Sequence, residues 1–267
     1  LTSTGQVAAQ GQKRAGTDIT LVAANLSLSD SHTRAGRNIS LTASDNLDNS
    51  RGHLHSDGTL TLTSGALLRN DVGDISAAQI NISAADLSNR GGKLAQSGSN
   101  ATTLAITRVL DNTSGSIQTN SADLSLSPQQ LINDNGNIAH AGQGTLNIST
   151  GALSNNAGNI ATNGQLTLHT HSLSNRSGSI SQAGVADTLI TSTGNADNSG
   201  GTLISNGLKL SLQLGSLNNT QGQINHLGAG QLTLDTGTLN NAGGNINAAQ
   251  LSITATDLNN RAGNIVQ

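Results

Sequence analysis

Two pairs of histidines are the residues of this chain whose type and spacing could do chemistry. His53 and His55 form one His-x-His pair, and His169 and His171 form the other. Residues two apart on a β-strand share one face and lie about 6.6 Å apart, so each pair could supply two of the three protein ligands of a catalytic zinc ion. The sequence identifies no third ligand for either pair. We therefore expect exposed structural histidines, with no metal site and no cofactor.

Carboxylates are the second group that could carry a reaction. A β-helical polysaccharide lyase or hydrolase needs clustered acidic residues, either for a Ca²⁺ site or for a paired acid and base. The 15 acidic residues of this chain are instead scattered, as Asp86, Asp111, Asp123 and Asp187 show. Calcium-binding nonapeptide repeats also do not fit, because each Gly-Gly pair is followed by Lys, Thr or Asn. The sequence predicts no catalytic residue and no enzyme, and a lyase is kept as a remote alternative.

Composition excludes further classes of function. The chain has 267 residues and contains no Phe, Tyr, Trp, Cys or Met. A net charge of −3 without a basic stripe, and the absence of aromatic stacking platforms, exclude nucleic-acid binding. No apolar run approaches the ~20 residues that cross a bilayer, and no signal peptide or initiator Met is present, so we expect an internal piece of a longer protein without a membrane span. Its core must be thin and built from Leu, Ile, Val and Ala.

An internal repeat defines the elements that position every side chain. The pattern Leu-x-Asn-x-x-Gly-x-Ile/Leu recurs eleven times, with successive asparagines 19 to 23 residues apart. The leucine is present in ten copies, and Ala196 replaces it in the other. The asparagines are Asn49, Asn70, Asn89, Asn112, Asn133, Asn155, Asn175, Asn198, Asn219, Asn241 and Asn260. The glycines are Gly52, Gly73, Gly92, Gly115, Gly136, Gly158, Gly178, Gly201, Gly222, Gly244 and Gly263.

Alternating apolar pairs lie between these motifs, as in Leu60-x-Leu62 and Leu166-x-Leu168. A period of two is typical of strands with one buried face. A repeat of about 21 residues with three short apolar stretches fits one coil of a parallel β-helix, whose strands pair with those of the next coil ~4.8 Å away. Leucine-rich repeats share this length but usually include a helix, which the Gly, Asn, Ser and Thr content disfavours. We predict an all-β parallel β-helix, a solenoid of about 12 to 13 coils.

The motif asparagine and glycine have expected structural roles. We expect each asparagine at a corner of its coil, where stacked side-chain amides hydrogen-bond one another along the axis. We expect each glycine in a turn that needs either a positive φ or a close approach of two backbones. Both sets are therefore predicted to hold the fold and to take no part in catalysis.

The repeat extends over the whole chain, which predicts a single β-helical domain of residues 1–267. Residues 1–45 are variant coils, in which Ala15-Gly16-x-x-Ile19-x-Leu21 recurs twenty residues later and Leu28 takes the asparagine position. Residues 46–267 carry the full motif. Length variation is predicted at one edge only, between the motif Ile/Leu and the following pair, with the longest loops at 96–103 and 182–188. These loops fit plain spacers or a recognition edge.

The repeat resembles a known family, the filamentous haemagglutinin repeat. The resemblance rests on copies such as residues 153–160, Leu-Ser-Asn-Asn-Ala-Gly-Asn-Ile, followed by Leu166-Thr167-Leu168, and it covers essentially the whole chain. It implies a right-handed β-helical stalk of a large Gram-negative exoprotein, exported by two-partner secretion through an outer-membrane transporter. Family members are adhesins or contact-dependent growth inhibition effectors. The Asn-Pro motifs of the secretion domain and the Val-Glu-Asn-Asn element before a toxin are absent here, so the resemblance implies internal shaft and leaves a following toxin open.

Two hypotheses about function remain. The first is a monomeric structural stalk, secreted or on the outer surface of the cell, which displays distant binding or toxin modules. The second is a module that itself binds a receptor or glycan on another cell, through the variable loop edge or through a Ser/Thr/Asn face. The absence of cysteine fits export in an unfolded state. Faces rich in Thr also suggest ice binding, but Thr alternates irregularly with Ser, Asn and His.

Overall fold

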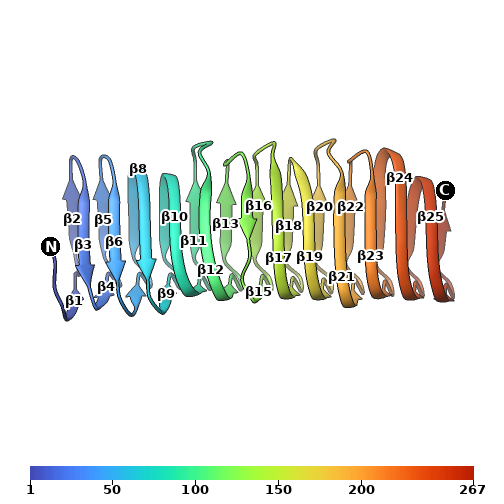
Figure 1. Cartoon of the computed structure of the whole chain (residues 1–267), viewed down its shortest axis with the longest axis horizontal. Helices are drawn as coiled ribbons and strands as arrows, with labels where there is room; N and C mark the ends of the chain where they lie inside the picture. The colour runs from blue at the N-terminus through green and yellow to red at the C-terminus, as the bar shows by residue number, and fades with distance from the viewer.

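The chain folds into a straight rod of stacked β-coils, with its two termini at opposite ends (Figure 1). The computed structural model describes residues 1–267 and contains 26 strands in one continuous sheet and no helix. Every strand pairing is parallel and joins one coil to the next, as in Asn137↔Asn159 and Asn159↔Ser179. The predicted all-β parallel solenoid, with about 12 turns and a repeat of about 21 residues, is confirmed. None of its elements is an apolar helix of the length that a bilayer crossing requires.

Each coil has three faces, which we name by their place in the repeat. The first face carries the motif Ile/Leu, the second face carries the alternating pair, and the third face leads into the motif Leu-x-Asn. We call the bend between the first and second faces the first corner, the bend between the second and third faces the second corner, and the Asn-x-x-Gly bend the motif turn.

Some strands stay on one face and others continue around a corner. The first face alone holds β2 (Gln12–Ala15), β5 (His32–Ala35), β11 (Lys93–Gln96), β13 (Ser116–Thr119), β16 (Asn137–His140), β18 (Asn159–Thr162), β20 (Ser179–Gln182), β22 (Thr202–Ser205) and β26 (Asn264–Val266). The second face alone holds β3 (Ile19–Ala23), β6 (Ile39–Ala43) and β14 (Leu124–Leu126). The third face alone holds β1 (Gln6–Ala8), β4 (Asn25–Ser27), β7 (Leu47–Asp48), β9 (Leu67–Arg69) and β15 (Gln130–Ile132).

The longer strands cross corners without a break. The first and second faces share β8 (His53–Ser64). The second and third faces share β12 (Thr102–Asp111), β17 (Thr145–Ser154), β19 (Gln165–Ser174), β21 (Thr188–Asp197) and β23 (Leu210–Asn218). All three faces are joined in β10 (Asp74–Ser88), β24 (Gln223–Asn240) and β25 (Asn245–Asn259).

A single apolar core runs along the axis of the rod. It contains 49 buried residues, all of them Leu, Ile or Ala. Like side chains stack on one another because the strands are in register, as in Leu146↔Leu166 on the second face and Leu131↔Leu153 on the third. Slender aliphatic side chains therefore fill the narrow cross-section of each coil, and no aromatic residue is needed.

The predicted register needs two corrections. Leu104 aligns with Ile82 and Leu126 as the second member of its pair, so the preceding loop is shorter than predicted and Thr102 takes the first inward position. This polar residue is accepted because its Oγ1 lies 2.7 Å from Oγ1 of Thr119.

The second correction concerns the corners. Length variation is not confined to the first corner, because the pairing also shifts at the second corner. These shifts fall between Ala84 and Asp86 and between Thr170 and Leu173. An extra residue at this corner leaves the spacing of apolar residues on each face intact, so the alternation of the sequence does not reveal it.

The motif turn has the same backbone conformation in every copy. The residue before the motif glycine, rather than the glycine itself, has a positive φ. Non-glycine residues at this position have φ between 52° and 57°, and they are Arg51, Val72, Ser114, Asn135, Ala157, Ser177, Gln221 and Ala262. The other three are Gly91, Gly200 and Gly243. Most of the turns thus hold a side chain in the left-handed region, which costs roughly 1–2 kcal/mol for a residue with a Cβ atom.

Val72 has the least suitable side chain for this position, because it is β-branched, and it is 67% exposed with φ 57°. We predict that Val72→Gly raises the free energy of unfolding by about 1 kcal/mol, the relief of strain exceeding the extra chain entropy of glycine. Chemical denaturation of the whole chain measures this. Val185, 78% exposed and without a positive φ, is the matched control, and Val185→Gly is expected to lower stability slightly. Equal effects of the two substitutions would contradict the strain argument.

Candidate functional site

The eleven motif asparagines lie in one row along the rod. Each follows directly after a third-face segment, and all except Asn260 at the C-terminal end are buried. In each pair of successive coils the Nδ2 group donates to Oδ1 of the next asparagine, at 2.7–2.8 Å. The structure therefore brings all the predicted asparagines together.

Asn155 illustrates the contacts of one member of this row. Besides Asn175 in the next coil, its Nδ2 lies 3.3 Å from the carbonyl of Gly158 in its own turn and 3.1 Å from the carbonyl of Ser179. Its backbone carbonyl accepts a hydrogen bond from Gly158 N–H at 3.1 Å. A side-chain amide donates through Nδ2 and accepts through Oδ1, so it can repeat in this geometry.

The row begins abruptly at its N-terminal end. Oδ1 of Asn49 is buried and has no hydrogen-bond donor, because Leu28 occupies the equivalent position of the preceding coil. Ser31 takes the place of the motif glycine there, and its buried hydroxyl is also unpartnered. The variant coils predicted for residues 1–45 thus lack the amide row.

The motif glycines are the sites of closest contact between coils. A Cβ atom added to Gly158 would lie 2.0 Å from the carbonyl oxygen of Asn133 and 2.6 Å from Oδ1 of Asn155. At each of the ten motif glycines from Gly73 to Gly263, an added Cβ atom would lie within 2.4 Å of the carbonyl oxygen of the asparagine in the preceding coil. At Gly52 it would lie 2.7 Å from the carbonyl oxygen of Leu28. Of the two roles expected from the sequence, the geometry of these glycines corresponds to the close backbone approach.

Carboxylates cap the outer side of several motif turns. Burial raises the pKa of Asp111, but hydrogen bonds from the hydroxyl and backbone N–H of Thr113 and the ion pair with Arg90 hold that pKa below its usual value. Asp197 has the same arrangement with Ser199 and Arg176. A lowered folded-state pKa stabilises the fold above the unfolded pKa, and this contribution is lost as the pH falls through the acid range. These carboxylates therefore have structural partners and are not poised as catalytic acids.

The two predicted histidine pairs lie on different faces and do not meet. His53 and His55 project from the first face, and His169 and His171 project from the second face and second corner. The ring of His53 stacks on that of His32 in the preceding coil, with centroids 4.6 Å apart. His32 is a partner that the pair spacing did not indicate.

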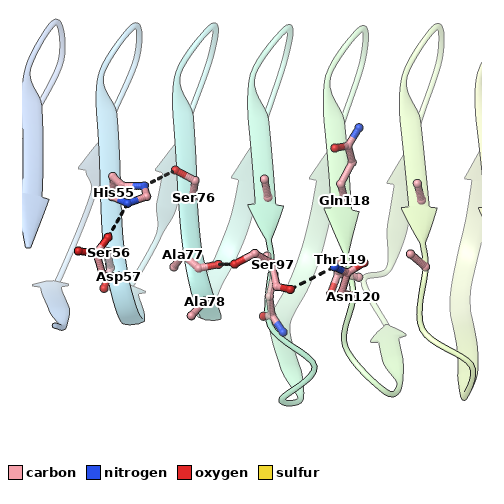
Figure 2. A pocket seen from close by; sticks show the side chains of 14 residues that line it. His55, Ser56, Asp57, Ser76, Ala77, Ala78, Ser97, Gln118, Thr119 and Asn120 are labelled. Atoms are coloured by element: carbon pink, nitrogen blue, oxygen red, sulfur yellow. Dashed lines mark hydrogen bonds and ion pairs between the residues drawn. The ribbon is translucent and has the colours of Figure 1, made fainter. Parts of the chain in front are cut away.

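His55 has both ring nitrogens engaged, as Figure 2 shows. Its Nδ1 lies 3.0 Å from Oγ of Ser76, and its Nε2 lies 2.9 Å from Oδ1 of Asp57. Asp57 in turn accepts two hydrogen bonds from the Arg34 guanidinium. This is a closed network of side chains, without a free base or a free carboxylate.

One hollow of the surface lies beside this network, on the first face and first corner (Figure 2). It has a volume of about 510 Å³, is open to solvent, and is lined by small or polar side chains such as Ala77, Ser97 and Gln118. The chain has no group of three or more His, Asp, Glu or Cys side chains placed to hold a metal ion. The hollow offers hydrogen-bonding groups and no catalytic constellation.

Sequence reasoning missed a column of buried polar residues at the first corner. Nε2 of Gln96 donates to the carbonyls of Gly98 and Asn100, and its Oε1 accepts from Ile80 N–H. Gln182 holds the loop that follows it in the same manner. The four longest first-corner loops of the interior coils are 97–101, 141–145, 183–187 and 227–231, and each follows a glutamine or a histidine at this position, which is a signal that the sequence contained.

Other members of this column are histidines, His140 and His226, both buried. His140 lies between Oγ1 of Thr162 and the carbonyl of Ser121, each 2.9 Å away. Both nitrogens of His226 are buried without a partner. Neither histidine is accessible to a substrate.

Comparison with known proteins agrees with this repeat geometry. The family model described as Haemagglutinin repeat matches residues 1–51, 141–200 and 227–267. The chain is 42% identical over 90 residues, 32% of its length, to tRNA nuclease CdiA-2 of Burkholderia pseudomallei (strain 1026b), of which this covers 3%. It is 30% identical over 155 residues, 55% of its length, to Toxin CdiA of Yersinia pestis, of which this covers 5%.

No solved structure matches the chain. The chain corresponds to only a small part of either curated relative. The three segments that match the family model together make up more than half of the residues, and the coils between them have the same motif turn. The chain therefore belongs to the haemagglutinin repeat family.

Proposed function

We propose that this chain is a stalk segment of a large exoprotein, secreted or on the outer surface of a Gram-negative bacterium, that holds binding or toxin modules at a distance. The observation that carries the proposal is the uninterrupted stack of coils, joined throughout by one core and, from Asn49 onward, by one amide row. The haemagglutinin repeat and the two relatives support an exoprotein of the adhesin or growth inhibition type. An outer-membrane two-partner-secretion transporter is then the partner during export.

Interactions between neighbouring coils give such a stalk its stiffness. The asparagine row links each coil to the next, and so do the arginine–aspartate ion pairs Arg51–Asp30, Arg90–Asp111 and Arg176–Asp197. Each coil contacts only its neighbours, so the stability of a solenoid is close to a sum of terms for the coils and their interfaces. Length can then be added without a change in the local structure, which suits a spacer.

This architecture also suits folding outside the cell. The chain has no cysteine, so no disulfide can form before or during passage through a transporter. A completed coil presents a full edge of backbone N–H and C=O groups, on which the next coil pairs. We propose that the coils form in succession as the chain emerges.

The structural role of the asparagine row can be tested at Asn155. We predict that Asn155→Asp lowers the free energy of unfolding by about 3–5 kcal/mol at pH 7, because a buried carboxylate would face the Oδ1 atom of Asn175 without a donor. The pKa of the introduced carboxyl should be raised in the folded state, so the deficit relative to wild type should shrink as the pH falls toward 4. Denaturation of both proteins at the two pH values measures this.

Asn156→Asp is the matched control for Asn155→Asp. Oδ1 of Asn156 accepts hydrogen bonds from Ser174 and from Arg176 N–H. Asp134, at the same place one coil earlier, makes the equivalent contacts to Ser154 and Asn156 N–H with a carboxylate. The control should therefore change stability by less than about 1 kcal/mol. A similar loss from both substitutions would contradict a specific role of the buried row.

The stalk function is tested by deletion of whole coils. Removing residues 134–175 joins Asn133 to Arg176 and takes out two coils in register. The rod should keep its fold and shorten by about 10 Å, which small-angle scattering measures. In the full exoprotein, receptor binding should persist while reach between cells falls. Loss of receptor binding after deletion would instead identify this segment as the binding module.

A second candidate function, adhesion through the loop edge, is favoured by one observation. Three exposed apolar side chains, Val185, Leu208 and Leu227, lie in consecutive coils at the first corner. The Leu208 N–H donates to the Val185 carbonyl, so the first two are adjacent. Of the other large exposed apolar residues, Val72 lies in a motif turn and the rest lie in the terminal coils. Exposed apolar clusters often mark contact surfaces.

This candidate predicts that the triple variant Val185→Ser, Leu208→Ser, Leu227→Ser reduces binding to target cells at least tenfold and leaves the thermal unfolding transition in place. Val72→Ser on the motif turn is the control and should bind like wild type. A flow-cytometric binding assay with the labelled chain measures both. Unchanged binding of the triple variant would leave the stalk as the function of these coils.

A further inference from the structure

His169 and His171 form the one His-x-His pair of the chain whose outward nitrogens are free. The residues beside them, Leu168 and Thr170, point into the core, so both imidazoles project from the same side of β19. Nδ1 of His169 lies 2.6 Å from Oγ1 of Thr191 in the next coil. Nδ1 of His171 lies 2.8 Å from Oγ1 of Thr193. Neither Nε2 atom has a protein partner.

These hydroxyl contacts bear on the tautomer of the imidazoles, that is, on which ring nitrogen carries the hydrogen. Oγ1 of Thr191 also lies 3.5 Å from the carbonyl of Leu168, and when it donates there it accepts the hydrogen of His169 Nδ1. Nε2 of His169 then carries the lone pair that a metal ion needs. Histidines that ligate metals commonly donate their second ring N–H in this way, which fixes the ring and its tautomer. Thr193 lies at the same place beside Nδ1 of His171.

The surroundings of the pair suit a cation. The residues that flank it in the preceding coil are Ser149 and Gly151, and those in the next coil are the two threonines. None of them is basic. Nε2 atoms that share a tetrahedral ion lie about 3.4 Å apart for metal–nitrogen distances of 2.0–2.1 Å. The Cα atoms of residues two apart on a strand lie about 6.6 Å apart, so the two imidazoles must turn toward each other to share one ion.

The other pair has the same sequence pattern and lacks these properties. Both nitrogens of His55 are engaged by Ser76 and Asp57 (Figure 2). His53 is stacked on His32. The guanidinium of Arg34 lies in the same network and repels a cation. The His53-x-His55 pair can therefore serve as an internal control for metal binding by the sequence pattern alone.

We propose that His169 and His171 bind a borderline divalent transition-metal ion, of the class Ni²⁺, Cu²⁺ and Zn²⁺, through their two Nε2 atoms. Water fills the remaining coordination positions, since no third protein ligand is placed at the site. Imidazole ligands suit this class of ion, and carboxylate-preferring Ca²⁺ and Mg²⁺ do not bind. This assignment departs from the expectation of no metal that the sequence alone supported.

Calorimetric titration of the whole chain with NiCl₂ tests the proposal. Wild type should bind one ion per chain, and His169→Gln and His171→Gln should each weaken binding at least tenfold. Gln keeps a polar side chain for the threonine, so the fold should persist, as the unfolding temperature will report. Thr193→Val leaves both ligands and should weaken binding by about tenfold, the effect expected of a lost partner of a metal-ligating histidine.

His53→Gln is the matched control and should bind Ni²⁺ like wild type. In ¹H–¹⁵N spectra of the histidine rings, Zn²⁺ should shift the Nε2 signals of His169 and His171 and leave those of His55 in place. The proposal is overturned if the double variant His169→Gln, His171→Gln binds as tightly as wild type. It is equally overturned if His53→Gln abolishes binding, or if the shifted signals belong to the first-face pair.

Discussion

The constraint on which this structure depends is parallel, in-register stacking at the spacing of a β-sheet. Each residue must suit the residue that occupies its own position in the coil before and the coil after. An amide meets this condition, because Asn155 accepts from Asn133 on one side and donates to Asn175 on the other. A charged side chain in the same place would meet its own charge about 4.8 Å away on both sides. The buried positions of the coil are therefore restricted to aliphatic side chains and to self-complementary polar ones.

Positions that do not meet this condition contain buried polar atoms without a hydrogen-bond partner. Where Leu28 precedes Asn49, a buried oxygen atom has no donor. His226 makes the same point at the first corner, since it lies between Ser205 and Ala248, and neither nitrogen finds a partner. His140, in the equivalent position, has Thr162 beside it and is satisfied. An unpaired buried polar group costs about 1–3 kcal/mol. The identity of the residue one coil away thus decides whether a polar side chain stabilises the rod.

Much of the fold could be predicted because stacked coils require similar residues at regular intervals in the sequence. The motif Leu-x-Asn and the alternating pairs located the three faces, and the spacing located the coils. What failed were features that leave this period unchanged. Thr102 points inward because Thr119 satisfies it, which a search for apolar pairs overlooks. The residue with a positive φ precedes the motif glycine and varies in type, because it is exposed to solvent and the strain is tolerated there. The glycine itself does not vary, because an added Cβ atom would clash with the backbone of the preceding coil.

Chemistry on a solenoid depends in the same way on the neighbouring coils as well as on the strand that carries a motif. His53-x-His55 and His169-x-His171 are indistinguishable as patterns within one strand. The next coil offers each pair a hydroxyl group, Ser76 or Thr191. The preceding coil separates the pairs, because Arg34 lies beside His55 and Ser149 lies beside His169. Asp57, on the same strand as His55, completes the network with Arg34 around the first pair only. Function in such a chain is therefore inferred by comparing residues about 21 apart, because the residues at equivalent positions of the neighbouring coils determine what a motif can do.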